Sequence, residues 1–382
     1  MHRNKMRNLM IKLPILLCIG IFLGCNKFES KTNTNELSFR IEVSKSELSH
    51  GELLLSSYPL LNKVIGKDSL LVFDGVSSQL ILFNLVTKTP IFNLELEKDG
   101  PNFFEGHVLD ADIKDDKLYV VTNNYFTIAD LTGNVSVRRK LKSLTSNDNF
   151  RVLGFNRLSD QSFLFSRWLE SSIFAHRKDS VDQSIFFVYN LRENSFYDIP
   201  IFSPEEALIN DSTQGFYDGL SRHSFVYLDS TIVYNFKFSS KLYSYDLRNQ
   251  LAQVSNGEFD HIPNLREAFP SNQISDVKAT TNYLYNGVQF SDIAYDEKNE
   301  LFVRVGSEYV TNEDGTNNDV RYLMLLDKHL NRVKEFKIKD RIFDKPFIND
   351  GIIYFVSGNQ TKESTYELIT FEIKNESIIE KP

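Results

Sequence analysis

The side chains best suited to bind a ligand are basic and aromatic, and most of them fall in long segments between predicted strands. The set consists of Arg167, Trp168, His176, Arg177, Arg222, His223 and Arg266, with Arg304 on a predicted central strand. Guanidinium groups pair with carboxylates through parallel hydrogen bonds, and a charge on an interior strand must find a partner or line a channel. In a chain of formal charge −8, this set predicts a site for a small acidic or sugar-like ligand.

Motifs for catalysis and metal binding are absent or incomplete. The sequence has no His-Glu-x-x-His, Gly-x-Ser-x-Gly or glycine-rich phosphate motif. Residues 110–116 (DADIKDD) resemble a calcium loop but lack its internal glycine and closing glutamate, and residues 312–319 are a second acidic loop. We interpret both segments as turn acids. The sequence therefore predicts no catalytic residue, no metal and no cofactor, and we expect a protein that is not an enzyme.

The N-terminus has the pattern of an export signal that ends in a lipid anchor. Residues 1–12 carry four cations and no acid, residues 13–23 are apolar, and Gly24 and Cys25 follow. The apolar run is about half of the ~20 residues that span a bilayer, so it predicts a signal peptide over residues 1–24. The cysteine at its end resembles the bacterial lipobox, with Phe22 where leucine is usual. We expect a diacylglycerol on Cys25; an ordinary signal peptide is the alternative.

Lipidation of Cys25 would leave the mature chain without a thiol, because the other cysteine, Cys18, lies in the removed segment. Residues 25–36 are polar and predict a flexible, membrane-attached tether. Asn26 differs from the aspartate that resembles an inner-membrane retention signal, so we expect an outer-membrane lipoprotein, periplasmic or surface-exposed. Without the four cations of the signal peptide the charge is −8 − 4 = −12, which argues against nucleic acid as a partner.

Residues 37–382 are predicted to form one domain of repeated β units. Each unit has a strand, a short turn, an apolar strand, a variable loop and a hairpin. The predicted hairpin turns lie at Asn84, Asp130, Asn190, Asp246, Asp327 and Glu372. Four strands repeated six times, without a convincing helix, indicate an all-β six-bladed β-propeller. A sandwich or barrel is the alternative.

Two further expectations concern the number of blades and the closure of the ring. The gap from Asp246 to Asp327, 327 − 246 = 81 residues, leaves a seventh blade possible. The alternating residues 36–44 form a strand that could close the ring by pairing with the last repeat.

The topology of a propeller assigns the long loops to one face. If the strands of a blade are named A to D from the axis outward, A–B and C–D turns lie on one face, and B–C and D–A connections on the other. The turns of the first kind are short, whereas residues 167–184 and 306–319 (B–C) and 202–221 and 255–289 (D–A) are long. Binding usually resides in long loops on a rigid scaffold. We therefore expect the loop face to be the working face; tolerated decoration is the alternative.

Short motifs resemble those of a known family. They are Gly100-Pro101-Asn102 after the first unit, Ile293-Ala294-Tyr295-Asp296 before the strand that carries Arg304, and the lipobox. With these residues the chain resembles uncharacterised six-bladed propeller lipoproteins of Bacteroidota, known only by a domain of unknown function. The resemblance implies a propeller and export, and it implies no activity.

The sequence leaves three functions open. The favoured one is a lipid-anchored binding or scaffold module that uses its loop face, with an unknown protein or a small ligand as partner. The second is a lactonase-like propeller hydrolase with a metal in the central channel, which would need acids, amides or histidines clustered on the inner strands. The third is a glycan-binding accessory lipoprotein of an outer-membrane uptake system, although the single tryptophan counts against an aromatic sugar platform.

Overall fold

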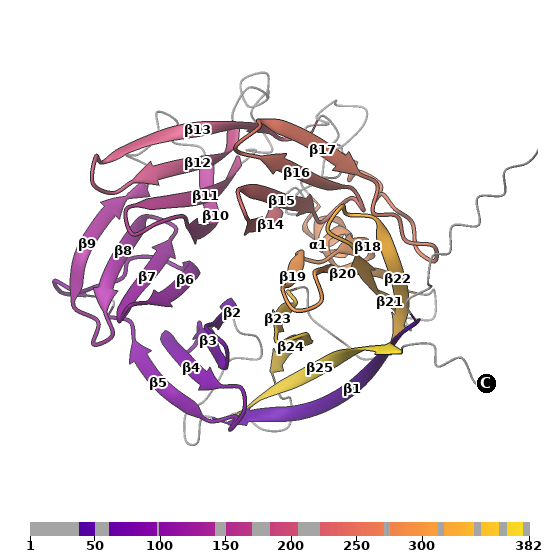
Figure 1. Cartoon of the computed structure of the whole chain (residues 1–382), viewed down its shortest axis with the longest axis horizontal. Helices are drawn as coiled ribbons and strands as arrows, with labels where there is room; N and C mark the ends of the chain where they lie inside the picture. Colours follow the sequence, from indigo (N-terminus) through magenta and orange to yellow (C-terminus); the bar gives the residue numbers. More distant parts are fainter. Residues whose placement is uncertain are drawn as a thin grey trace, which may run out of the picture. The chain divides into compact units, whose positions relative to one another are not determined.

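The computed structural model places six β-sheets in a ring around a central axis, as the sequence predicted (Figure 1). It describes residues 38–49, 61–97, 99–141, 150–169, 184–204, 222–270, 273, 276–311, 317–339, 345–358 and 365–376. The predicted signal peptide, Cys25 and the tether lie outside these residues. Every sheet is antiparallel where its pairing is described, and each forms one blade of the propeller.

Blades 1 to 3 each consist of four strands that follow one another in the chain. Blade 1 contains β2 (Leu61–Ile65), β3 (Ser69–Asp74), β4 (Gln79–Asn84) and β5 (Pro90–Glu95). Blade 2 contains β6 (Val108–Lys114), β7 (Lys117–Thr122), β8 (Tyr125–Asp130) and β9 (Val135–Lys140). Blade 3 contains β10 (Phe150–Arg157), β11 (Ser162–Leu169), β12 (Ser184–Asn190) and β13 (Ser195–Phe202).

Blades 4 to 6 keep this order with two variations, a split inner strand and a closing strand. Blade 4 contains β14 (His223–Leu228), β15 (Thr231–Phe236), β16 (Leu242–Asp246) and β17 (Leu251–Ser255). Blade 5 contains β18 (Gly287–Phe290), β19 (Ala294–Asp296), β20 (Leu301–Thr311), β21 (Asn317–Leu326) and β22 (Arg332–Ile338). Blade 6 contains β23 (Phe347–Asn349), β24 (Ile352–Gly358), β25 (Thr365–Glu376) and β1 (Ser38–Ser49).

The ring closes through its first strand. β1 lies beside β25 and supplies the outermost strand of blade 6 (Figure 1). The Ser44 and Thr370 hydroxyls are 2.5 Å apart, and Lys374 Nζ lies 2.6 Å from a Glu42 oxygen. Closure by the N-terminal strand is therefore confirmed. The predicted hairpin turn at Glu372 is wrong, because this residue lies inside β25 and β1 takes the place of the expected hairpin strand.

The other five predicted turn residues do shape their hairpins. Asp130 shows how: its carboxylate accepts hydrogen bonds from the backbone N–H groups of Thr132 and Asn134, both at 2.9 Å. These bonds and those from the two side chains stabilise the charged form and lower the pKa of Asp130 to about 2. The same side-chain to backbone pattern occurs at Asn84, Asn190, Asp246 and Asp327.

The core consists of apolar layers between neighbouring blades. Alternate side chains of a strand point to opposite faces of its sheet, so each blade contributes apolar residues to two layers. Between blades 2 and 3, the Phe126 ring lies 4.8 Å from Phe163 and 5.4 Å from Phe165, measured between centroids. Such tilted and edge-to-face contacts are favourable for aromatic rings. They hold adjacent blades in fixed positions around the axis.

Two details differ from the sequence prediction. Residues 256–286 contain the helix α1 (Val277–Tyr285), capped by the Asp276 carboxylate, instead of a seventh blade. Much of residues 306–319 is strand, because β20 and β21 stay paired as far as Thr311 and Asn317. In the described part of the chain, no helix is long and apolar enough to span a bilayer.

Candidate functional site

One cavity of the propeller lies on its axis. It has a volume of about 390 Å³ and takes lining residues from the innermost segment of every blade. These segments include β2, β6, β10, β14, β19 and β23, which surround the centre of the ring in Figure 1. Small-molecule sites usually measure roughly 300–1,000 Å³, so this axial cavity has the size of a site for one small ligand.

One side of the axial cavity carries an ion pair. Lys63 Nζ on β2 lies 3.7 Å from Asp110 Oδ1 on β6, and 5.0 Å from the centre of the Phe155 ring. Asp110 is 8% exposed, and its carboxylate also accepts hydrogen bonds from the backbone N–H groups of Ala111 and Phe155, both at 2.9 Å. The backbone bonds fix the carboxylate, which leaves the lysine as the group that can turn toward a ligand.

Blades 5 and 6 supply two further charges. Asp292 is half-buried and Lys345 is exposed, and both line the cavity. Neither side chain has a hydrogen bond or ion pair with another residue in the described part of the chain; the Asp292 carboxylate acts on Arg304 only through its field. Ser224 and Tyr227 add hydroxyl groups to the same lining. The axial cavity therefore offers carboxylates, ammonium groups and hydroxyls together.

The strand register places these charges toward the loop face. Asp110, Asp292 and Lys345 each stand four residues before the last residue of their A strand, namely Lys114, Asp296 and Asn349. A strands begin at the D–A connection and end at the A–B turn. The charged residues consequently lie at the end of the cavity nearer the loop face.

Arg304, predicted to bind a ligand, is instead a buried structural residue. It is 0% exposed, and its guanidinium donates to the backbone carbonyls of Ser240 (2.6 Å), Phe236 (2.8 Å) and Ser239 (2.7 Å). Desolvation lowers the pKa of Arg304 to about 9, and the field of Asp292 opposes this shift. The side chain stays charged at neutral pH and holds the B–C connection of blade 4 against blade 5.

Two other predicted arginines also bind the main chain. Arg167 donates from Nε to the Ser184 carbonyl at 2.5 Å, and its Nη2 lies 2.9 Å from an Asp198 carboxylate oxygen. Arg266 donates to the Val288 carbonyl at 3.0 Å and stacks over Tyr283, with 4.2 Å from its guanidinium carbon to the ring centre. Both are buried. They serve the packing of their blades and do not line the axial cavity.

The structure does bring Trp168 and Arg222 together. The Arg222 guanidinium carbon lies 4.8 Å from the centre of the Trp168 ring, and Arg222 is exposed whereas Trp168 is buried. This contact links β11 of blade 3 to the residue before β14 of blade 4. His176 and Arg177, which were predicted beside them, lie outside the described residues.

His223 lines the axial cavity, but its ring is packed between blades 3 and 4. It contacts Phe186, Tyr234 and Phe236, with centroid distances of 5.2 Å, 6.5 Å and 5.7 Å. Desolvation lowers its pKa to about 3, so the imidazole is neutral at physiological pH. Its Nε2 is buried and has no hydrogen-bond partner in the described structure.

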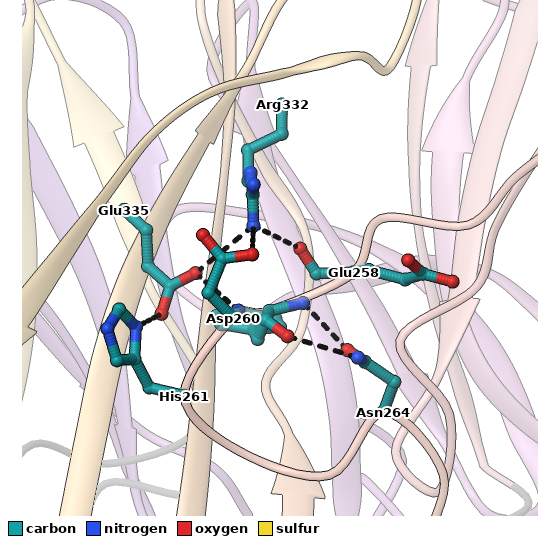
Figure 2. Close-up of polar contacts among 7 residues, drawn as sticks. Glu258, Asp260, His261, Asn264, Arg332 and Glu335 are labelled. Carbon is teal, nitrogen blue, oxygen red and sulfur yellow. Dashed lines mark hydrogen bonds and ion pairs between the residues drawn. The ribbon is translucent and has the colours of Figure 1, made fainter.

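The connection from blade 4 to blade 5 is fixed by polar contacts at the outer strands (Figure 2). Arg332 on β22 donates to the Glu258 carbonyl at 3.0 Å and lies 2.6 Å from Asp260, while His261 Nδ1 lies 2.9 Å from Glu335. Further in, Gly306 permits close contact, because a Cβ there would lie 2.5 Å from Ile262. This part of the loop face is thus a packed platform.

The sequence prediction missed the charged residues of the axial cavity. Asp110 was interpreted as a turn acid, yet it belongs to β6; Asp115 and Asp116 of the same run do form the turn, with φ of 51° and 57°. Aligning the inner strands would have revealed a charge four residues before the strand end in blades 2, 5 and 6. The described residues contain no group of three or more His, Cys, Asp or Glu side chains arranged to hold a metal.

Comparison with known proteins agrees with this fold. A family model described as a domain of unknown function, DUF4221, matches residues 36–337. A DUF4221 protein from Bacteroides vulgatus ATCC 8482 is 16% identical, with a TM-score of 0.71 over 89% of this chain and 99% of that one. A candidate exported protein from Bacteroides fragilis NCTC 9343 is 14% identical, with a TM-score of 0.56 over 90% and 98%. No curated protein matches the sequence. Since the family model matches more than half of the chain, the protein belongs to the DUF4221 family.

Proposed function

We propose that the protein is a lipid-anchored, extracytoplasmic binding module that holds a small acidic sugar-like ligand in its axial cavity. The observation that carries the proposal is the mixture of charges in that cavity: Lys345 and Asp292 have no described partner, and Lys63, paired with Asp110 at 3.7 Å, could turn toward a carboxylate. Asp292 and Tyr227 supply partners for hydroxyl groups, whereas the Ser224 hydroxyl is already bonded to Asn235 and to the Ile293 N–H. The scaffold is rigid, so a ligand would lose its own freedom without reordering the protein.

The proposal differs from the sequence expectation in where the ligand binds. The ligand would enter from the loop face, as expected, but it would contact the inner strands in place of Arg167 and Arg304, which bind the main chain. Of the contacting residues Trp168 and Arg222, only Arg222 is exposed, so a larger ligand would reach this contact only through the arginine. A metal-dependent hydrolase has no observation in its favour among the described residues.

Export and anchoring belong to the same proposal and rest on the N-terminal pattern that ends at Cys25. A similar fold occurs in the candidate exported protein from Bacteroides fragilis, which is in keeping with an extracytoplasmic place. An outer-membrane lipoprotein would be labelled by palmitate, and Cys25→Ala should lose the label. Label retained by this variant would contradict the anchor.

Titration with glucuronate, followed by calorimetry, tests the ligand class. We expect the chain to bind glucuronate more tightly than glucose, because only the acid can pair with the lysines. Lys345→Ala should weaken binding about ten-fold, the loss of one charge-assisted hydrogen bond of about 1.5 kcal/mol. Lys328→Ala, at an exposed turn lysine, serves as the matched control. Equal affinity for glucose and glucuronate, or an equal loss in both variants, would contradict the proposal.

A further inference from the structure

A second cavity lies on the perimeter, between the outer strands of blades 5 and 6. This perimeter groove measures about 570 Å³. Its lining consists of Phe39, Arg40, Ile41, Val43, Phe336, Lys337, Ile338, Lys339 and Phe371. Figure 1 shows β1 and β22, which supply most of these residues, as the outermost strands of adjacent blades. The perimeter groove is separate from the axial cavity and shares no lining residue with it.

The perimeter groove combines an apolar floor with a basic rim. Phe39, Ile41 and Phe336 are half-buried and pack on the core between blades 5 and 6, while Val43 is 48% exposed. All three charged residues of the groove, Arg40, Lys337 and Lys339, are cations and exposed. None of them forms an ion pair with another described residue. Glu42, on the same strand as Arg40, pairs with Lys374 and feels Arg40 only through its field. Three exposed cations thus gather on this rim of a chain of net charge −8, which favours an anionic partner.

The chain itself brings this groove close to the membrane anchor. β1 starts at Ser38, and the groove is lined by the residues that follow at once, Phe39 to Val43. Residues 25–37 separate the predicted lipid from this start, a span of at most about 45 Å when fully extended. The anchoring membrane is therefore within reach of the groove. Its surface offers anionic headgroups for the cations and acyl chains for the apolar side chains.

We propose that the perimeter groove docks on the anionic phospholipid surface of the membrane that carries the anchor. The cations would pair with phosphate groups, while Phe39, Ile41 and Val43 would contact the boundary between headgroups and acyl chains. Docking would add a second, reversible contact to the lipid on Cys25. The inference uses the proposed anchor only to bring the groove close to a membrane. The groove should bind an anionic phospholipid surface even when the chain carries no lipid.

Flotation of the mature chain with Cys25→Ser, which carries no lipid, tests the groove apart from the anchor. We expect binding to vesicles of phosphatidylglycerol and phosphatidylcholine in a 30:70 ratio, and weak binding to pure phosphatidylcholine. The variant Arg40→Gln/Lys337→Gln/Lys339→Gln should bind the anionic vesicles at least about ten-fold more weakly, since each cation near such a surface contributes about 1 kcal/mol.

A control variant with the same change in charge is Lys67→Gln/Lys114→Gln/Lys117→Gln, at exposed positions of blades 1 and 2. It should bind anionic vesicles nearly as the parent chain does. Equal losses in both triple variants, or no dependence on phosphatidylglycerol, would overturn the proposal. So would a dimer in light scattering that only the groove variant abolishes, because a second copy would then occupy the groove. Palmitate labelling tests the anchor, and glucuronate titration tests the axial cavity. Failure of either proposal can therefore be distinguished from failure of the perimeter groove to bind vesicles.

Discussion

Two regions of this propeller use cations in opposite ways. In the packed layer between blades 4 and 5, Arg304 is fully buried and both of its Nη groups donate to carbonyls of residues 236–240. In the axial cavity, Lys345 is exposed and Asp292 half-buried, and neither is tied to a described side chain. The first arrangement stabilises the scaffold and the second leaves charges free. The conspicuous arginines are therefore not the residues with which we expect the protein to bind.

Replacing Arg304 by methionine tests whether the buried arginine stabilises the scaffold. Three backbone carbonyls would lose a charged donor inside the protein, so we expect the free energy of unfolding to fall by about 3–5 kcal/mol. Arg222→Met, at an exposed arginine, should cost less than about 1 kcal/mol. Urea unfolding of both variants measures the difference. A loss below 1 kcal/mol at Arg304 would show that its carbonyl contacts do not hold the loop face.

Gly306→Ala tests the packed region without removing a charge. The added methyl would approach Ile262 to 2.5 Å and Phe259 to 2.9 Å, so the connection between blades 4 and 5 must shift. We expect a loss of about 1–3 kcal/mol, typical of an overpacked core. Gly66→Ala would be a poor control because of its positive φ, whereas Lys328→Ala, at an exposed turn position, is a neutral one. Unchanged stability of the glycine variant would mean that the connection is loosely packed.

His223 lines the axial cavity with its ring packed between blades 3 and 4, and its burial predicts a dependence of stability on pH. Its pKa of about 3 in the folded chain lies below the ordinary 6.5, so between these values the unfolded chain binds a proton that the folded one does not. Stability should therefore decline as the pH falls from 6.5 toward 3, by up to about 1.4 kcal/mol per unit. Of its three ring contacts only Tyr234 is ionisable, and burial raises the pKa of that phenol further.

Urea unfolding of the parent chain and His223→Phe at pH 7 and pH 5 isolates this contribution. All other ionisable groups are common to both proteins, so the parent should lose about 1–2 kcal/mol more than the variant between these pH values. Parallel losses would show that the imidazole gains a proton in the folded state as easily as in water.

Lys345→Ala gives the smallest effect on stability and completes the comparison. The exposed side chain has no described partner, so unfolding should change by less than about 0.5 kcal/mol although glucuronate binding weakens. Thermal unfolding with and without glucuronate separates the two effects. A large loss of stability in the absence of ligand would place Lys345 in the scaffold, with Arg304.

The propeller was predictable from sequence because its signal is repeated. Hairpin turns at Asn84, Asp130 and Asp246 recur with apolar strands before them, and each copy strengthens the others. The closing strand β1 was also foreseen from its alternation. Glu372 was misplaced because β25 simply continues where the other blades turn, and a single acidic residue does not distinguish a turn from an exposed strand position.

The candidate site was harder to predict, because the role of a charge depends on where its strand faces. Arg304 and Lys345 carry the same sign, but the first points into an interblade layer and the second lines the axis. The sequence shows that side chains alternate along a strand with a period of two. It does not show which of the two faces of the sheet a given side chain occupies. The charges of the axial cavity became apparent only in the structure, where the inner segments of all six blades surround one cavity.

The most direct test uses a chain that begins at residue 25, in which Cys25 is the only thiol. With Cys25→Ser, a single cysteine introduced by Asn156→Cys would line the axial cavity, and a small maleimide should modify it. Saturating glucuronate should slow this modification at least ten-fold, whereas an exposed Lys328→Cys should react at the same rate with or without it. Modification at position 156 that glucuronate does not slow would contradict the claim that the axial cavity is the binding site.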